Sequence, residues 1–143
     1  MTGLMQTNNI PQVAMAFMND VHAEEAELVN RLNELIEQHK KDPSVEAEID
    51  QAMMEWIEHT VAHFERENRL MQETGFPAYS IHAEEHDRAL AALNLLHKNW
   101  REQRDIVVLA EYVQINWPQW FHDHISTMDT VTALFFQQSG LTV

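Results

Sequence analysis

The sequence predicts an all-α protein, an up-down-up-down antiparallel four-helix bundle with a short N-terminal arm. Its 143 residues suit one domain, and glycine (3) and proline (4) are too scarce to supply the turns of a sheet. Apolar residues recur at a helical period in four long segments, so each segment is expected to bury one face. Long helices joined by short turns pack as antiparallel neighbours. We therefore treat residues 1–143 as a single domain.

The first two predicted helices span about residues 11–40 and 44–73. The sequence KKDPS separates them, and its proline can end one helix and occupy the first turn of the next. Asp42 or Ser44 supplies the side-chain oxygen that caps the second helix. Both helices carry an apolar stripe, which predicts that they lie against a common core.

The third and fourth predicted helices span about residues 80–102 and 105–137. Gly75 suits the C-terminal cap of the preceding helix, and Ser80 is placed to cap the third. Pro118 must kink the fourth helix or divide it. A kink is favoured because an apolar stripe continues in phase past the proline; it comprises Val113, Trp117, Trp120, Met128, Val131 and Phe135.

The charge balance and the missing residue types exclude several classes of function. A net charge of −14 makes nucleic acid and anionic membranes unfavourable partners, because both would repel the chain. No long apolar run occurs and no lysine or arginine precedes Arg31, so neither membrane insertion nor a signal peptide is expected. Without cysteine the chain can form no disulfide, thiol nucleophile or iron–sulfur ligation. These features favour a cytoplasmic protein of bacterial type.

Nine histidines are unusual in an acidic chain of this length. The segment EHTVAHFERE places His59, His63 and Glu67 at intervals of four, so all three project from the apolar stripe of the second helix. Each of the other helices also carries histidine on its apolar stripe. These histidines are His22, His82, His86 and His124.

The positions of these residues along their helices predict that they meet. With a rise of about 1.5 Å per residue, each lies about as far from its connecting turn as its counterpart on the next helix. In an antiparallel bundle they therefore share one layer of the core. Buried and unpaired, each would cost several kcal/mol. A metal ion removes this cost, because imidazole nitrogen and carboxylate oxygen are good ligands for iron and similar ions.

Asp129 is a further candidate ligand, although it follows His124 by five residues. Five residues turn a regular helix through about 500°, which would point Asp129 about 140° away from His124. A one-turn π-bulge would bring the carboxylate back to the core. We therefore predict a bulge or a local distortion between these two residues.

Four motifs, in order and over about residues 11–137, resemble the hemerythrin family. That family combines a lone histidine on the first helix with HFxxE, HxxxH and HxxxxD on the next three. Here the motifs read His22, HFERE from His63, HAEEH from His82 and HISTMD from His124. The resemblance implies a four-helix bundle around a non-haem centre of two iron ions, joined by an oxo or hydroxo bridge.

The resemblance also implies a role for each of these residues. One iron would be held by His82, His86 and His124. The other would be held by His22 and His63, which leaves it an open position where dioxygen binds in the family. The bridging carboxylates would be Glu67 and Asp129. The apolar pocket around dioxygen would consist of Phe64, Trp120, Phe121 and Ile125.

Two positions depart from the family pattern. Many relatives have a second glutamate directly after the bridging one, where this chain has Asn68, which we interpret as a surface residue of little effect. Bacterial relatives often have an aromatic residue one turn before the second-helix histidine, where this chain has His59. By its angle His59 faces the core, about 6 Å along the axis from His63. It is either a hydrogen-bonded core residue or a polar group that alters oxygen chemistry or metal content.

Two other classes of metal protein do not fit the sequence. Ferritin-like di-iron enzymes have a glutamate three residues before a ligand histidine, and no histidine here has one. The zincin motif has a glutamate directly after its first histidine, and Ala83 stands at that position after His82.

Three functions remain. Reversible dioxygen binding for storage, delivery or sensing is favoured, because five neutral ligands and two carboxylates carry less negative charge than a carboxylate-rich site and stabilise high-valent iron poorly. The alternatives are a di-iron enzyme acting on peroxide or nitric oxide, including weak peroxidase-type activity, and iron buffering. No linker or second domain is recognisable, so we expect a freestanding oxygen-binding protein rather than an enzyme or a fused sensor.

Overall fold

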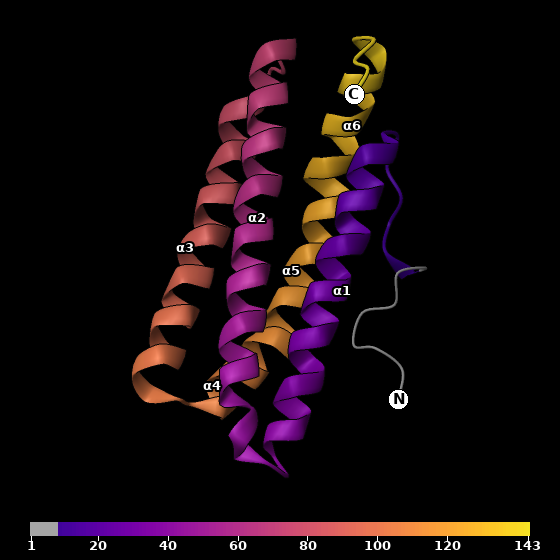
Figure 1. Ribbon diagram of the computed structural model, residues 1–143. Coiled ribbons are helices and arrows are strands. Elements are labelled where there is room, and N and C mark those ends of the chain that lie inside the picture. The colour runs from indigo at the N-terminus through magenta and orange to yellow at the C-terminus, as the bar shows by residue number, and fades with distance from the viewer. Residues whose placement is uncertain (1–8) are drawn as a thin grey trace.

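The computed structural model describes residues 9–143 (Figure 1), so the predicted N-terminal arm lies almost wholly outside the described residues. Residues 9–143 contain helices and no strand. The first three rods are single helices: α1 (Ala16–His39), α2 (Glu46–Thr74), which follows the short turn η2 (Pro43–Val45), and α3 (Tyr79–Gln103). The fourth rod is a run of five segments: α4 (Ile106–Glu111), η3 (Tyr112–Asn116), α5 (Trp117–His124), η4 (Ile125–Asp129) and α6 (Thr130–Gln138).

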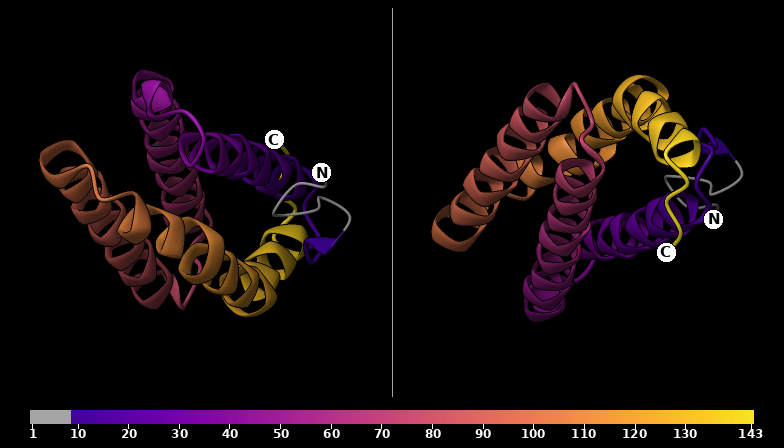
Figure 2. Two further views of the ribbon diagram at one scale, coloured as in Figure 1. Left: turned by 90° about the horizontal axis from the view of Figure 1, so that it is seen from below. Right: turned by 90° about the horizontal axis from the view of Figure 1, so that it is seen from above.

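The rods form the predicted antiparallel bundle. Successive rods run in opposite directions, as the colour gradient in Figure 1 shows. Seen along the bundle, α1 and α3 flank α2, and the fourth rod closes the remaining side (Figure 2). The four rods therefore surround one long interior, to which each contributes its apolar stripe.

Local residue chemistry explains three of the helix boundaries. Asp42 accepts a hydrogen bond from the backbone N–H of Ser44 at 3.1 Å, which makes Asp42 the cap of the turn before α2. Gly75 ends α2 with φ of 71°, a left-handed conformation that glycine adopts without a Cβ clash. Asp105 caps α4 through the N–H groups of Val107 and Val108.

The predicted start of the first helix and the predicted cap of the third are wrong. The first helix begins at Ala16 rather than at residue 11, because the Asn19 side chain bonds both the N–H and the C=O of Val13 and holds this segment outside the helix. The third helix begins at Tyr79, and Ala78 occupies its N-cap without a side-chain hydrogen bond. Ser80 therefore lies inside the helix and does not cap it.

Pro118 neither divides the fourth rod nor ends a helix there. The widened π-turn η3 precedes it, in which the Trp117 N–H bonds the carbonyl of Tyr112, five residues back. A proline ring clashes with the carbonyl four residues earlier in a regular helix, and a wider turn provides room for the ring.

The predicted stripe of the fourth helix fails after the second π-turn, η4. Val131 is exposed and Phe135 only half-buried, whereas Thr132, Ala133 and Phe136 are buried. A π-turn contains one extra residue, so every later position rotates by one relative to a regular helix. A stripe extrapolated at a constant period therefore selects the neighbouring residues.

The core consists of two apolar clusters separated by a polar layer. The larger cluster includes Trp56, Trp100 and Trp117, and the smaller includes Met71 and Phe136. Between them lies a layer of buried histidine and carboxylate side chains. Within residues 9–143, no helix has the length and apolarity needed to cross a membrane.

Candidate metal centre

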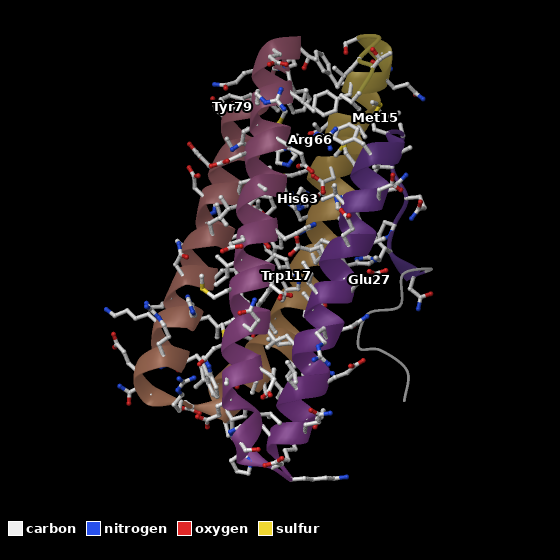
Figure 3. All side chains as sticks on the ribbon, viewed as in Figure 1. Met15, Glu27, His63, Arg66, Tyr79 and Trp117 are labelled. Atoms are coloured by element: carbon white, nitrogen blue, oxygen red, sulfur yellow. The ribbon has the colours of Figure 1, made fainter. Side chains whose placement is uncertain are left out.

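The polar layer brings together all seven residues that the sequence nominates as metal ligands. Each of the four rods contributes at least one of them, and all seven are buried. His63 projects from α2 into the interior of the bundle (Figure 3). The set is His22 from α1, His63 and Glu67 from α2, His82 and His86 from α3, His124 from α5 and Asp129 from η4.

The π-turn η4 places Asp129 in this layer. The Thr130 N–H bonds the carbonyl of Ile125, five residues back, and Asp129 is only 1% exposed. This widened turn absorbs the extra residue between His124 and Asp129, so both side chains face the interior. The predicted bulge is confirmed.

One oxygen of each carboxylate faces the three histidines of α3 and α5. Glu67 Oε1 lies 3.4 Å from His86 Nε2 and 3.8 Å from His82 Nε2. Asp129 Oδ1 lies 3.2 Å from both His82 Nε2 and His124 Nε2. These five residues can direct one ligand atom each to a common point.

The other oxygen of each carboxylate faces the remaining two histidines. Glu67 Oε2 lies 2.7 Å from His63 Nε2, and Asp129 Oδ2 lies 2.9 Å from His22 Nε2. Glu67 also belongs to a second group of potential ligands, with His22 and His63. Each carboxylate thus divides its two oxygens between a three-histidine side and a two-histidine side.

Unsatisfied polar atoms within residues 9–143 concentrate in this layer. Buried side-chain nitrogen and oxygen atoms without a hydrogen-bond partner are His22 Nδ1 and Nε2, Glu67 Oε1, His86 Nε2, Trp117 Nε1, His124 Nδ1, and Asp129 Oδ1 and Oδ2. Five of these atoms, excluding the two histidine Nδ1 atoms and the indole nitrogen, face the interior of the cluster. Because each such atom costs about 1–3 kcal/mol, the donor set fits metal ions that would accept their lone pairs.

The charges within the layer are strongly coupled. Burial alone would lower the pKa of His63, but the charge of Glu67 and hydrogen bonds to Glu25 and Glu67 raise it to about 10. Burial and the charge of Asp129 would raise the pKa of Glu67, yet His63 and His86 lower it to about 2. Burial likewise opposes ionisation of Asp129, whose pKa is held well below its usual value by His124, His22 and His82. Positive charge is therefore required beside these carboxylates, and metal ions would supply it with release of protons.

A comparison with known protein families agrees with this geometry. The family model "Hemerythrin HHE cation binding domain" matches residues 13–133. The chain belongs to the hemerythrin family. It is 31% identical to a bacteriohemerythrin of Aquifex aeolicus (strain VF5) over 137 residues, which cover 96% of this chain and 98% of the relative. It is 30% identical to a bacteriohemerythrin of Ralstonia nicotianae (strain ATCC BAA-1114 / GMI1000) over 95 residues, 66% of this chain and 68% of that protein. No solved structure matches the chain at a significant level.

In this hemerythrin domain, three histidines are anchored by bonds on the side of the ring away from the carboxylates. His82 Nδ1 lies 2.8 Å from Thr132 Oγ1, and His86 Nδ1 lies 2.8 Å from Asn68 Oδ1. His63 Nδ1 lies 3.4 Å from Glu25 Oε1. Such bonds fix the tautomer that leaves Nε2 free to bind metal.

The interpretation of Asn68 as a surface residue is wrong. Asn68 is half-buried, and its carbonyl oxygen accepts a hydrogen bond from His86 Nδ1. It directly follows Glu67 on α2, and α2 packs against α3, which brings its side chain to the back of the His86 ring. An amide at this position therefore orients His86 without adding negative charge.

Glu25 is the functional candidate that sequence reasoning missed. It is 0% exposed and accepts hydrogen bonds from the side chains of Trp56 and Thr60, both at 2.7 Å. Burial alone would raise the pKa of Glu25, but hydrogen bonds from His59 and His63, the charge of His63 and the bond from Thr60 lower it to about 2. The signal was its position three residues after His22, which places it on the same buried stripe.

His59 lies beside the cluster rather than in it. Its side chain is 23% exposed, and its Nδ1 lies 2.9 Å from Glu25 Oε1. Its ring centroid lies 6.2 Å from that of His63. A hydrogen bond that His59 donates to Glu25 raises the pKa of His59, against the opposing effect of burial. Glu25 thus contacts both histidines, and His59 is the one that is partly exposed to solvent.

The four predicted pocket residues are distributed over both sides of the cluster. Phe64 stacks on His86 with ring centroids 4.0 Å apart, and Trp120 stacks on His124 at 4.6 Å. Phe121 meets the His22 ring edge-on at 5.7 Å, and Ile125 is fully buried in the larger apolar cluster. The first two aromatic rings therefore cover the three-histidine side, while Phe121 covers the two-histidine side.

Proposed function

We propose that this hemerythrin domain holds two iron ions and binds dioxygen reversibly. The observation that carries this proposal is the division of each carboxylate between the two histidine groups, which suits two bridged ions. The proposed ligands of one iron are His82, His86 and His124. Those of the other are His22 and His63, and Glu67 and Asp129 are shared.

An iron pair held in this way would supply one ion with fewer protein ligands, where dioxygen can bind. The chain's own contribution is a dry and rigid surrounding. Phe121 packs edge-on against His22. Ile125, which directly follows His124 in the sequence, is fully buried. Such apolar side chains exclude water from the site, which would favour reversible binding of dioxygen if iron is held there.

A second candidate is an enzyme that acts on peroxide or nitric oxide. The observation that favours it is the polar contact from His59, whose side chain is 23% exposed, to the buried Glu25 beside His63. Such a contact would connect the two-histidine side to solvent and support chemistry that consumes protons. The non-enzymatic role remains our proposal because the apolar side chain of Phe121 covers the His22 ring.

One experiment separates these functions. The purified chain is loaded with iron(II) without oxygen, exposed to air and then deoxygenated while its near-ultraviolet and visible spectrum is recorded. Reversible binding predicts charge-transfer absorption that forms with dioxygen and disappears on its removal. Irreversible oxidation with turnover of added peroxide would support the enzyme. Iron uptake without any response to dioxygen would leave iron buffering as the function.

A further inference from the structure

We propose that Glu25 is a positioning residue that orients His63 and strengthens it as a ligand; this inference rests on the proposed di-iron site. His63 lies between two carboxylates. Its Nε2 lies 2.7 Å from Glu67 Oε2, and its Nδ1 lies 3.4 Å from Glu25 Oε1. A metal ligand histidine that donates its second N–H to a carboxylate has a fixed ring and a more basic ligand nitrogen.

The Glu25 carboxylate is itself held in one orientation. Trp56 Nε1 donates to Glu25 Oε2 at 2.7 Å, and the Thr60 hydroxyl lies 2.7 Å from the same oxygen. An indole N–H can only donate, so the group it meets must be an acceptor. The other oxygen, Oε1, is thereby left facing the two histidines of α2.

The outer partners of the five proposed histidine ligands are unequal. His82 meets a hydroxyl and His86 an amide carbonyl, both neutral. On the two-histidine side, the outer nitrogen of His22, Nδ1, has no hydrogen-bond partner. His63 is thus the one histidine of that pair with a carboxylate behind it, so Glu25 is expected to determine how firmly that side holds iron.

His59 competes with His63 for the same oxygen. Its Nδ1 lies 2.9 Å from Glu25 Oε1, closer than the 3.4 Å of His63 Nδ1. Replacing His59 with an apolar residue would release Glu25 Oε1 to His63 alone. Removal of the Glu25 carboxylate should therefore weaken iron binding by His63, whereas removal of His59 should leave this binding as strong or make it stronger.

Glu25→Gln is the decisive variant because it keeps the shape of the side chain. Trp56 requires the single amide oxygen, so the amide NH₂ would face His63. An imidazole beside this NH₂ accepts at Nδ1 and carries its proton on Nε2, which then cannot bind metal. Loss of this type of outer partner weakens metal binding by about 10–100-fold.

The assay is anaerobic calorimetric titration of each metal-free chain with iron(II), which separates a tighter and a weaker binding step. Thermal unfolding of the same metal-free samples reports structural damage independently. Glu24→Gln is the matched control, since Glu24 is 62% exposed and 3.6 Å from His59 Nε2.

We expect Glu25→Gln to weaken one iron-binding step by about 10–100-fold and leave the other unchanged. His59→Leu should bind iron at least as tightly as the parent, and the Glu24→Gln control should match the parent. Equal binding by the parent and a folded Glu25→Gln variant would overturn the inference. If Glu25→Gln does not fold, weaker binding by His59→Leu would overturn it instead. A parent chain that binds no iron would refute the proposed function itself.

Discussion

Removal of iron should cost this protein much of its folding stability. Five unsatisfied atoms face the interior of the cluster: His22 Nε2, Glu67 Oε1, His86 Nε2, and both carboxylate oxygens of Asp129. Four of them form two close contacts, His22 Nε2 with Asp129 Oδ2 at 2.9 Å and His86 Nε2 with Glu67 Oε1 at 3.4 Å. If each contact and the remaining oxygen are counted once, at about 1–3 kcal/mol for each poorly satisfied group, the metal-free chain loses at least about 3 kcal/mol relative to the loaded one. Native domains have a total stability of roughly 5–15 kcal/mol, so the loss should be visible as a large shift in unfolding.

Urea unfolding followed by far-ultraviolet circular dichroism, without oxygen, measures this difference. A urea dependence of about 1–3 kcal/mol per M converts the expected loss into a midpoint lower by about 1 M or more in the chelator-treated chain. A His82→Ala, His86→Ala double variant provides the control, because added iron should not restore its midpoint. Equal midpoints for loaded and stripped parent protein would refute the reasoning that metal ions satisfy these atoms.

Three further outcomes follow from the geometry. Deletion of Ser126, an exposed residue of η4, should convert the π-turn to a regular helix with Asp129 still facing inward, so iron content should be retained; loss of iron would contradict this. His59→Leu should slow autoxidation of the oxygenated protein several-fold by removing the solvent-facing polar group, whereas an unchanged spectral decay rate would exclude this role. Without iron, the pKa of Glu25 is about 2, whereas its ordinary value is 4.5. The contribution of its ionised carboxylate to folding stability is therefore complete above pH 4.5 and is lost toward pH 2. Urea unfolding should then show the parent losing up to about 3 kcal/mol more than Glu25→Gln as the pH falls.

The sequence predicts the bundle well because capping residues mark helix ends and periodic apolar residues mark the buried faces. Asp42, Gly75 and Asp105 lie at helix boundaries as expected, since capping depends on residues close in sequence. The start of the first helix was misplaced because Asn19 binds the backbone of Val13, an alternative to helix that residue propensities do not reveal.

The ligand candidates could be nominated from the sequence, but their surroundings could not. Spacing along antiparallel helices is enough to predict one common layer, and a spacing of five to Asp129 indicates a π-turn. That same turn shifts the later buried positions to Thr132 and Phe136, which a constant period misses. Glu25 and Asn68 act through contacts between helices, so their roles depend on side-chain packing that one helix alone does not specify.

Anomalous diffraction at the iron absorption edge, from crystals of the iron-loaded chain, tests the central claim most directly. The account predicts two separate iron peaks in the polar layer, with Glu67 and Asp129 each contacting both and His82 and His22 contacting different peaks. A single peak, or iron bound only outside this layer, would contradict it.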